Sequence, residues 1–340
     1  MLNNKNKPKI LFIHQSWKGF EKRDFEILKK NFITKEILIY KNFLYKSFYA
    51  IKILKKIDIV FCWFAYRSAL LTLLFAKLFR KKIIIIAGGW ECADAPYINY
   101  GNMRKGIKFL FNRLITKYIF IIADKIVVVS EYNKSELIKN VGITEDKIVL
   151  IYNGVPINCC NDQFEIFQKE EFVLTVGEIN KENMKRKGLE VFINVAKLLP
   201  EIKFIIVGEI DKKLEYYLKR SIPNNLKLLG FINEDILHTL YRKAKVYAQL
   251  SYHEQFGCSL AEAMFHRCVP VITDKAALPE IVDKAGYYVP YGDIEKTAKA
   301  IKLALKDIQK GELARRRIIE LFSLQKREEA LVRLINEIWK

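Results

Sequence analysis

The sequence predicts an α/β protein made of two doubly wound domains, each a parallel sheet with helices on both faces. Three observations support this prediction. Short apolar runs alternate with helix-like segments along the whole chain, which is the pattern of strands joined by crossover helices. The chain of 340 residues is longer than one core usually allows. Hydrophobic residues make up 51% of it, enough to fill two cores.

The first half contains the apolar runs expected of strands that are buried on both faces of a parallel sheet. β-branched and aromatic residues dominate these runs, and segments with helical spacing separate them. The clearest predicted helices are Glu21–Asn31 and Met103–Ile122. The predicted strands are Lys9–His14, Glu36–Tyr40, Asp58–Phe64, Ile83–Ala87, Lys125–Ser130 and Ile148–Tyr152.

The second half repeats this alternation, with five more apolar runs and amphipathic segments between and after them. The predicted strands are Phe172–Gly177, Lys203–Gly208, Leu226–Phe231, Val246–Ser251 and Val269–Thr273. The predicted helices are Gly188–Leu199, Leu214–Ser221, Glu234–Lys243, Leu260–Phe265 and Glu295–Lys306.

Hydrophobic periodicity lapses from Asn153 to Gln168, beginning at the turn signal Asn153-Gly-Val-Pro. We therefore expect one domain over residues 1–155 and a second over residues 156–322. The last segment, residues 323–340, has the pattern of one amphipathic helix, which we expect to pack back on the first domain. Doubly wound sheets bind ligands outside the carboxyl ends of their strands, so a cleft between two such domains is the expected active site.

Charge is unevenly distributed along the chain. Residues 1–160 hold 28 Lys and Arg against 12 Asp and Glu, whereas residues 161–340 hold 30 against 26. The excess is either a solvated basic surface or a surface for an anionic partner: an anionic membrane, an acidic or phosphorylated acceptor, or nucleic acid. Each Lys or Arg near an anionic bilayer adds about 1 kcal/mol, so part of this excess on one face would hold the protein there.

The longest apolar runs are well short of a membrane span, and the N-terminal segment lacks a cleavage-site pattern. We therefore expect a cytoplasmic protein, peripheral at the inner face of the cell membrane if the basic half binds lipid. Six cysteines form no C-x-x-C pair, and we expect them to be reduced and mostly packed in the interior. They are Cys62, Cys92, Cys159, Cys160, Cys258 and Cys268.

The stretch from Ser251 to Glu262 carries the clearest signs of chemistry. It leaves a predicted strand, crosses a polar loop and enters a helix, a turn that directs backbone N–H groups at a phosphate or another anion. Glu254 in the loop and Glu262 on the first helical turn bracket it, with seven residues between them. This pattern favours a nucleotide-linked substrate. Alternatively, Glu262 forms a capping box with Ser259, which would leave Glu254 unexplained.

The segment Glu254-Gln-Phe-Gly-Cys-Ser-Leu-Ala-Glu262 resembles the E-x7-E signature of the family 4 retaining glycosyltransferases (glycosyl transferases group 1). These enzymes have the GT-B fold, two Rossmann-like domains facing a central cleft. The likeness covers roughly residues 120–310 well and residues 1–120 loosely. Further segments that fit the family are Asn153-Gly-Val, Lys187-Gly-Leu-Glu, Val269-Pro-Val-Ile-Thr-Asp, Leu278-Pro-Glu and Tyr291-Gly-Asp.

The resemblance implies transfer of a sugar from a nucleotide-diphosphate donor to an acceptor, with retention at the anomeric carbon. Glu254, facing the donor sugar, and Lys187, neutralising the diphosphate, are the implied catalytic residues. Lys187 could instead be a solvated lysine beside Arg186, which could share its role. Glu262 would bind the ribose hydroxyls. The other implied donor contacts are Gly19, the backbone at Phe231 and Ile232, and the helix start at Phe256, Gly257, Cys258 and Ser259.

We expect no metal ion and no other cofactor. The chain has no D-x-D pair to hold Mg²⁺ or Mn²⁺ on a diphosphate, so protein cations and the helix terminus would replace the metal. The family usually has Arg after the first glycine of the second domain, whereas this chain has Glu178 after Gly177. Lys185 or Arg186 could supply the missing cation.

Three residues are candidates for contact with the acceptor or the donor sugar. His14 ends the first predicted strand, while Glu91 and Asp94 follow the fourth, where the family often has a His. Glu91 or Asp94 could bind sugar hydroxyls or act as a base; alternatively, they are helix-start or turn acids. His14 is either a cleft residue or a satisfied strand-end histidine. One aromatic cluster fits a core better than an acceptor platform: Phe61, Trp63, Phe64 and Tyr66.

Two other functions stay open at this point. A nucleotide-sugar epimerase or a phosphorylase on the same fold would share the donor site. A non-catalytic basic protein that binds nucleic acid would account for the charge of the first half, but the sequence has no recognised nucleic-acid motif. The expected partners are a nucleotide-sugar donor, an acceptor glycan or a lipid-linked or phosphorylated acceptor, and an anionic membrane surface, with no nucleic acid.

Overall fold

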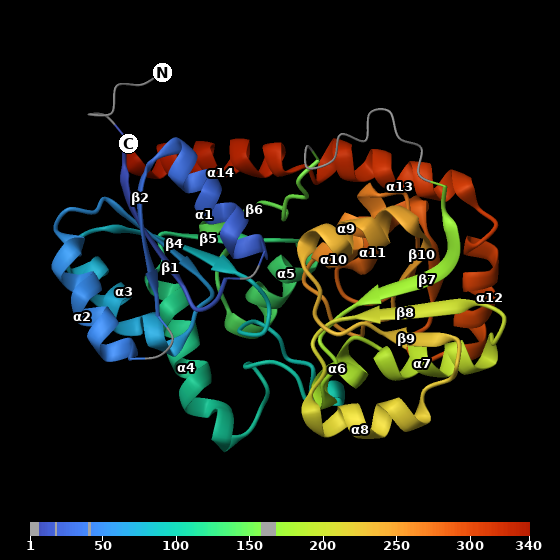
Figure 1. The fold of residues 1–340 in the computed structure, drawn as a ribbon. Coiled ribbons are helices and arrows are strands. Elements are labelled where there is room, and N and C mark those ends of the chain that lie inside the picture. The colour runs from blue at the N-terminus through green and yellow to red at the C-terminus, as the bar shows by residue number, and fades with distance from the viewer. Residues whose placement is uncertain (1–6, 18, 40–41, 158–167) are drawn as a thin grey trace. The chain divides into compact units, whose positions relative to one another are not determined.

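The computed structural model describes residues 7–17, 19–39, 42–157 and 168–340, and these form two compact α/β units. The first unit comprises Met1–Pro96, Tyr100–Gly154 and Gln325–Lys340; the second comprises Tyr97–Asn99 and Val155–Leu324. Figure 1 shows the helices and strands of both. The predicted fold class, with two parallel sheets and crossover helices, is confirmed.

The first unit is built on a six-stranded sheet whose neighbouring strands are all parallel, in the order β2-β1-β3-β4-β5-β6. Ile10 of β1 pairs with Thr34 of β2 on one side and with Ile59 of β3 on the other. The strands are β1 (Lys9–His14), β2 (Ile33–Leu38), β3 (Ile59–Trp63), β4 (Lys82–Ala87), β5 (Lys125–Val128) and β6 (Ile148–Leu150).

Helices cover both faces of this sheet (Figure 1): α1 and α14 lie on one face and α2, α3 and α4 on the other. The helices are α1 (Gly19–Asn31), α2 (Phe43–Leu54), α3 (Leu70–Leu78), α4 (Ile107–Ile122), α5 (Glu131–Glu136) and α14 (Leu324–Trp339). Three short turns of helix accompany them: η2 (Arg67–Ala69), η4 (Leu137–Val141) and η5 (Glu145–Lys147). A further turn, η3 (Pro96–Ile98), lies mostly in the short segment that belongs to the second unit.

The second unit has a six-stranded sheet of the same kind, in the order β12-β11-β10-β7-β8-β9. Val246 of β10 pairs with Val173 of β7 and with Val269 of β11, all in parallel. The strands are β7 (Glu170–Val176), β8 (Lys203–Val207), β9 (Leu226–Leu228), β10 (Ala244–Gln249), β11 (Val269–Thr273) and β12 (Tyr287–Val289).

The helices of the second unit follow its strands in turn, and side chains of Asn180, Asp211, Asn233, Asp293 and Asp307 cap five of them. The helices are α6 (Lys181–Arg186), α7 (Leu189–Leu198), α8 (Lys212–Ser221), α9 (Glu234–Lys243), α10 (Cys258–Phe265), α11 (Leu278–Val282), η6 (Asp283–Ala285), α12 (Ile294–Ala304) and α13 (Ile308–Leu321).

Several boundaries differ from the prediction, and glycines explain two of them. The predicted helix Met103–Ile122 begins only at Ile107, because Gly106 has a φ of +126°. The predicted strand Leu226–Phe231 ends at Leu228, and Gly230 with a φ of +67° turns the chain away. The strand predicted at Glu36–Tyr40 is instead Ile33–Leu38, where it pairs with β1 from its first residue. Tyr40 lies outside the described residues.

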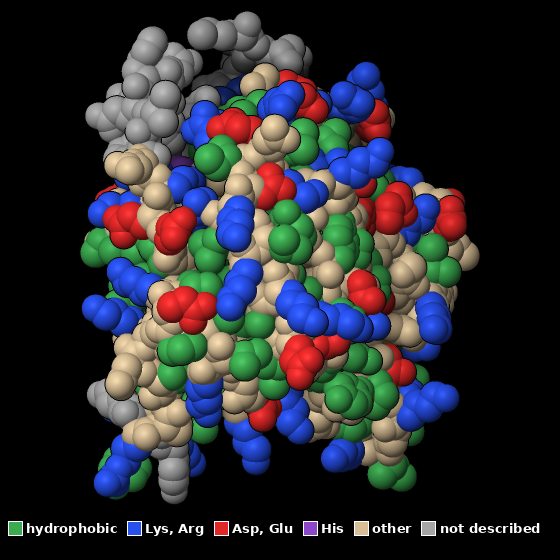
Figure 2. Space-filling view, turned by 90° about the vertical axis from the view of Figure 1, so that its right-hand side faces the viewer, with side chains coloured by type: hydrophobic (Ala, Val, Ile, Leu, Met, Phe, Trp, Pro, Cys, Tyr) green, Lys and Arg blue, Asp and Glu red, His purple; other side chains and the backbone are tan. Residues whose placement is uncertain are grey.

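Charged side chains of both signs lie on one side of the molecule. Figure 2 shows Asp and Glu side chains among the Lys and Arg side chains on the side where α7 and α12 lie in Figure 1, with apolar side chains scattered between them. Within the described ranges, no helix combines the length and apolar character needed to cross a membrane.

Candidate active site

Each sheet has one point where the strand order reverses. In the first unit the reversal lies between β1 and β3, and in the second unit between β7 and β10. Connections on the two sides of such a point leave in opposite directions, which opens a crevice outside the carboxyl ends of the strands. The loops that leave β7 and β10 in the second unit carry the predicted catalytic pair.

Glu254 and Lys187 form a close ion pair at the reversal point of the second unit. Lys187 Nζ lies 2.8 Å from Glu254 Oε1, and Arg186 Nη1 lies 3.8 Å from the same oxygen. The side chains of Lys187 and Glu254 are 18% and 13% exposed, so both are largely buried. The structure therefore brings these three predicted residues together around one carboxylate oxygen.

The environment of Glu254 keeps it ionised. Burial by itself would raise the pKa of this carboxyl, but the charges of Lys187 and Arg186 outweigh burial and lower the pKa to about 2. A carboxylate with this pKa carries its negative charge at any physiological pH. It can therefore stabilise a nearby positive charge, but it cannot act as a general acid.

The corner between α6 and α7 positions Lys187. Lys187 follows the last residue of α6, and its side chain passes so close to Gly177 that a Cβ there would lie 2.5 Å from Lys187 Cδ. Gly188 then adopts a φ of +65°, and a Cβ on it would lie 2.1 Å from the carbonyl oxygen of Leu250. Close backbone approach at Gly188 thus joins the α6–α7 corner to the loop that holds Glu254.

A polar network beneath Glu254 is a feature that the sequence analysis did not identify. Gln249 Nε2 donates to Glu254 Oε1 at 3.1 Å and to Ser251 Oγ at 2.7 Å, and Ser251 Oγ donates to Glu254 Oε1 at 3.2 Å. Tyr247 Oη donates to Gln249 Oε1 at 3.1 Å. The signal was present in the sequence: these three polar residues alternate along β10 and beyond it, so they share one face.

Helix α10 begins immediately after the loop, with Gly257 at its N-cap and a φ of +88°. Cys258 and Ser259 form its first turn, while Glu262 lies one turn further and its Oε2 accepts from Tyr241 Oη at 3.5 Å. Since Ser259 lies inside the helix, the alternative capping box with Glu262 is not formed. The Phe256 ring is 2% exposed and packs against Phe322, so only its backbone could contact a ligand.

The other predicted donor contacts lie on separate elements. Phe231 is 82% exposed on the loop after β9, and Ile232 is half-buried beside it. Gly19 is the first residue of α1 and belongs to the first unit. Glu178, which stands where the family usually has Arg, accepts from Asn180 Nδ2 at 2.8 Å. Lys185 is exposed near the end of α6.

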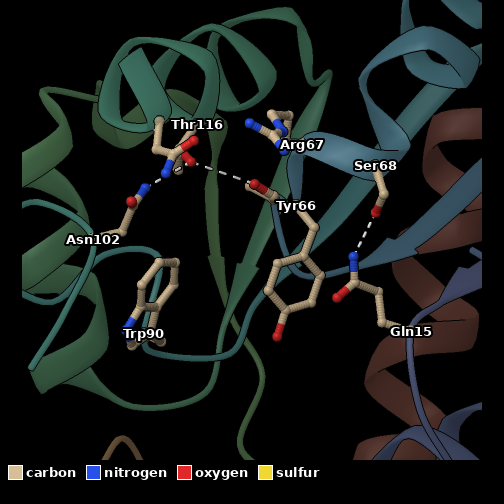
Figure 3. A pocket seen from close by; sticks show the side chains of 9 residues that line it. Gln15, Tyr66, Arg67, Ser68, Trp90, Asn102 and Thr116 are labelled. Carbon is tan, nitrogen blue, oxygen red and sulfur yellow. Dashed lines mark hydrogen bonds between the residues drawn. The ribbon is translucent and has the colours of Figure 1, made fainter. Parts of the chain in front are cut away.

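A second site lies at the reversal point of the first unit, where a pocket of about 330 Å³ opens. Trp90 and Tyr66 offer aromatic rings there, and polar side chains supply most of the rest of the lining (Figure 3). Asn102 Nδ2 donates to Thr116 Oγ1 at 2.8 Å. The lining residues are Gln15, Ala65, Tyr66, Arg67, Ser68, Trp90, Asn102, Asn112 and Thr116.

Backbone strain shapes this pocket. Phe64, at the end of β3, has a φ of +66°, which is rare for a bulky residue. Its ring fills the space beside Gly88, where a Cβ would lie 1.9 Å from the ring. The left-handed residue redirects the chain so that Tyr66 and Arg67 line the pocket. Phe61, Trp63 and Phe64 are buried, as the sequence predicted for this cluster; Tyr66 instead reaches the pocket.

The candidates for contact with the acceptor or donor sugar occupy different environments. His14 is fully buried; its Nδ1 lies 2.6 Å from the Ser16 carbonyl oxygen, and its ring packs on Trp17. Glu91 is 1% exposed and accepts from the Gly88 N–H at 2.8 Å, as a turn acid does. Asp94 is half-buried in the same loop. As placed, Glu91 belongs to the turn and not to an open surface.

Cysteine thiols and possible metal ligands are the remaining candidate groups. Cys62, Cys92, Cys258 and Cys268 are free thiols, and burial raises the pKa of Cys62, Cys92 and Cys268. Cys159 and Cys160 lie outside the described residues. Among the residues described, no group of three or more His, Cys, Asp or Glu is arranged to hold a metal ion.

Two doubly wound units, each with a polar site at its strand reversal, fit the GT-B class of α/β proteins. Family models agree: residues 9–158 match the model described as Glycosyltransferase Family 4, and residues 161–320 match Glycosyl transferases group 1. The crystal structure of Anabaena HepE in complex with UDP has a TM-score of 0.76, covering 97% of this chain and 100% of that one at 17% identity. The chain belongs to the group 1 glycosyltransferase family.

Two relatives are glycosyltransferases by name. A Campylobacter jejuni enzyme named as an N-acetylgalactosamine-N,N'-diacetylbacillosaminyl-diphospho-undecaprenol 4-alpha-N-acetylgalactosaminyltransferase is 26% identical over 69% of this chain. The processive diacylglycerol alpha-glucosyltransferase of Acholeplasma laidlawii is 24% identical over 58% of it. The matched regions span 64% and 62% of these relatives, a little under two thirds of each.

Proposed function

We propose that this glycosyltransferase moves a sugar from a nucleotide-diphosphate donor to a glycan or lipid-linked acceptor, with retention at the anomeric carbon and without a metal ion. The arrangement of Lys187, Arg186 and Glu254 at the start of α10 carries the proposal. The names of the relatives support it, because they describe transfer to a diphospho-undecaprenol-linked sugar and to diacylglycerol. The HepE structure that shares the fold contains UDP.

The donor diphosphate would lie against the N-terminus of α10 and the two cations. When the bond to the sugar breaks, negative charge develops on the leaving phosphate oxygen, and preorganised cations and N–H donors there lower the barrier. Lys187 and Arg186 supply the charge that Mg²⁺ supplies in other transferases. In the ligand-free chain they share Glu254 as their counter-ion, so the diphosphate would enter a site whose charges are already positioned.

Glu254 would face the sugar as its anomeric carbon becomes positive. Its carboxylate is fixed by Gln249 and Ser251 from below, so it is oriented before the donor binds. With no residue assigned as nucleophile, the leaving diphosphate would itself take the proton of the acceptor hydroxyl on the same face. Attack on that face gives retention.

The pocket of the first unit is the proposed site for the acceptor sugar. Aromatic rings such as that of Trp90 stack on the apolar faces of sugars, and side-chain amides such as those of Gln15 and Asn112 match sugar hydroxyls. Arg67 adds a cation, which suits an acceptor that carries a phosphate. Among the described residues that line the pocket, none is a carboxylate that would repel such a group.

Binding and transfer can be tested in one series. A thermal-shift panel of UDP, GDP, ADP and their sugars should contain a ligand that raises the unfolding midpoint, because saturation at 100 times Kd adds about 2.7 kcal/mol. With that donor, a radiolabelled sugar should pass to an acceptor, EDTA should not inhibit, and the product anomer should match the donor. Silence across the panel, isomerised donor alone, or loss of activity in EDTA would each contradict the corresponding part of the proposal.

Two variants test the roles at the donor site. Lys187→Ala should lower kcat by roughly 10²–10³-fold, because one donor to the developing charge is lost. Glu254→Gln keeps the shape of the side chain but removes its charge, so kcat should fall while the nucleotide alone still raises the midpoint. The control is Lys181→Ala, which removes an exposed lysine at the start of α6, the helix that Lys187 follows. Equal activity of Lys187→Ala and the control would exclude the role of Lys187.

A further inference from the structure

Helix α4 is apolar on both of its faces, unlike an ordinary surface helix. One face packs on the sheet through Thr116, Ile119, Phe120 and Ile122. The opposite face carries six large apolar side chains in solvent, with exposed fractions from 39% to 91%. They are Ile107 (91%), Leu110 (39%), Phe111 (65%), Leu114 (56%), Tyr118 (47%) and Ile121 (55%).

Cations flank this apolar stripe on both sides. Positions in a helix rotate by about 100° per residue, so the six exposed side chains fall within an arc of roughly 100°. Lys108 lies beyond one edge of the arc, and Arg113 and Lys117 lie beyond the other. The helix contains no Asp or Glu. Among the described residues, Arg113 and Lys117 have no ion-pair partner.

The neighbouring helix α2 extends the same surface. Its exposed side chains Leu44, Tyr45, Phe48 and Tyr49 are all more than half exposed, at 54%, 74%, 58% and 53%. Both α2 and α4 contact η2, and α3 packs on each of them; Figure 1 shows the three helices on one face of the sheet. Neither α2 nor α3 contains an acidic residue. We call this surface the α2–α4 face.

The α2–α4 face differs from the rest of the described surface. Elsewhere large apolar side chains also reach the surface, as Ile308, Leu313 and Ile319 do on α13, but that helix carries Glu312 and Glu320 among them. The two helices together expose ten apolar side chains and contain no acid, a composition that is typical of an interaction site.

We propose that the α2–α4 face rests in the headgroup layer of an anionic lipid bilayer. An apolar stripe bordered by cations fits that layer, because the rings and leucines enter the acyl boundary while lysines and arginines reach the anionic headgroups. A second copy of the chain fits less well. A symmetric dimer through this face would bring its cations together, whereas lipid phosphates neutralise them.

The pocket of the first unit shares helix α4 with this face. Asn112 and Thr116 line the pocket, while the stripe lies on the other side of the same helix. Docking would therefore hold the pocket near acceptors that are anchored in the bilayer. This consequence rests on the proposed function, whereas the docking itself does not require it.

Vesicle binding by the full chain tests the proposal. We expect co-sedimentation with phosphatidylglycerol-containing vesicles, weaker binding to pure phosphatidylcholine, and release as salt rises. Phe111→Ser with Leu114→Ser should weaken the partition into vesicles by roughly 100-fold, since each apolar side chain is worth about tenfold. Lys117→Glu should weaken it by about tenfold.

Matched controls come from the second unit. Leu303→Ser with Ile308→Ser removes two apolar side chains that are 56% and 72% exposed, against 56% and 65% for Leu114 and Phe111. Lys299→Glu matches Lys117→Glu in charge. Both controls should bind vesicles as the wild type does, and all variants should keep the wild-type thermal midpoint because every substituted side chain lies on the outer surface of its helix.

Each outcome decides the question. Wild-type indifference to anionic vesicles, or equal binding by the α4 variants and their controls, would overturn the docking. Loss of a dimer in the α4 variants without any vesicle binding would assign the face to a second copy and would also overturn it. Transfer to a water-soluble acceptor separates the two proposals: a chain that transfers but ignores vesicles refutes docking alone, and a chain that binds vesicles without transferring refutes the proposed function alone.

Discussion

Two buried carboxyl groups show how neighbours set the chemistry of a side chain. Glu254 has two cations beside it, and they outweigh burial and lower its pKa to about 2. For Glu91 the largest influence is burial, which raises its pKa to about 7, although backbone N–H groups of its own turn oppose the rise. One fold thus keeps Glu254 charged and gives Glu91 a pKa near neutral pH. Of the two, only Glu254 lies beside a proposed ligand.

The raised pKa of Glu91 predicts a pH dependence of stability. Below about pH 4.5, Glu91 is protonated in the folded and unfolded states. As pH rises, the unfolded chain ionises first, so stability falls until the folded carboxyl also ionises near pH 7. Glu91→Gln, neutral at every pH, escapes a loss of about 3 kcal/mol. The free energy of unfolding of Glu91→Gln should therefore rise relative to that of the wild type as the pH increases from 5 to 8.

Urea unfolding of both proteins at a series of pH values measures this difference. Glu26→Gln is the control, because Glu26 is an exposed acid of the same unit. The gap between Glu26→Gln and the wild type should stay flat over the same range. A flat gap for Glu91→Gln as well would mean that Glu91 is ionised in the folded protein throughout.

At the scale of elements, backbone contacts hold the loop after β10 against the α6–α7 corner. The Tyr252 N–H donates to the Arg186 carbonyl oxygen at 2.8 Å, and Tyr291 Oη donates to the Lys185 carbonyl oxygen at 2.8 Å. The first bond joins the loop after β10 to the α6–α7 corner beside Gly188, and the second ties that corner to the loop after β12. The ion pair between Lys187 and Glu254 is therefore a product of backbone geometry as much as of charge.

Gly188→Ala should disrupt the contact between the loop after β10 and the α6–α7 corner. The new Cβ would meet the Leu250 carbonyl oxygen, a backbone atom that cannot swing away, and the residue would also keep an unfavourable φ of +65°. We expect a loss of roughly 2–4 kcal/mol in the free energy of unfolding. Gly230→Ala is the matched control: its φ is +67°, but nothing lies within 4 Å of its Cβ. Its loss should be about 1 kcal/mol, and equal losses would show that the contact at Leu250 is not rigid.

The elements that could be predicted are those with a long local signal. The strand Val269–Thr273 and the helix Glu234–Lys243 have the predicted bounds, because apolar runs and an Asn cap mark them. Strand β12 was missed, since Gly286 and Pro290 bound an apolar run of only three residues, whereas β6 and β9 lie within longer runs. The first-unit pocket could not be predicted, because Gln15, Tyr66, Trp90 and Asn112 meet only through the sheet order. The roles of Glu254 and Lys187 stay predictions until tested.

At the scale of the whole molecule, the last segment of the chain completes the first unit. Helix α14 follows the entire second unit in sequence, yet residues 325–340 belong to the first unit. Arg327 Nε lies 2.6 Å from Asp24 Oδ1, and Arg327 Nη2 donates to Asp24 Oδ2 at 2.7 Å. Trp63 Nε1 donates to Asp24 Oδ2 at 3.0 Å. Because these groups are almost fully buried, each needs the others as partners.

Arg327→Met should therefore destabilise a unit whose other residues lie far away in the sequence. The substitution leaves Asp24 charged and buried, and it frees the carbonyl oxygens of Ile151 and Tyr152, which Arg327 Nη1 contacts at 3.0 and 2.9 Å. Breaking one partner of a buried pair costs about 3–5 kcal/mol. Asp24→Asn added to Arg327→Met should recover part of this loss, because the stranded charge is gone.

Urea unfolding of the single and double variants measures the coupling, with Arg333→Met as the control for an exposed arginine on the same helix. The free energy of unfolding of Arg333→Met should lie within about 0.5 kcal/mol of that of the wild type. If Arg327→Met unfolds like Arg333→Met, α14 does not close the first unit through this pair. If instead the double variant recovers stability, the first unit depends on residues that the chain supplies only after the second unit is complete.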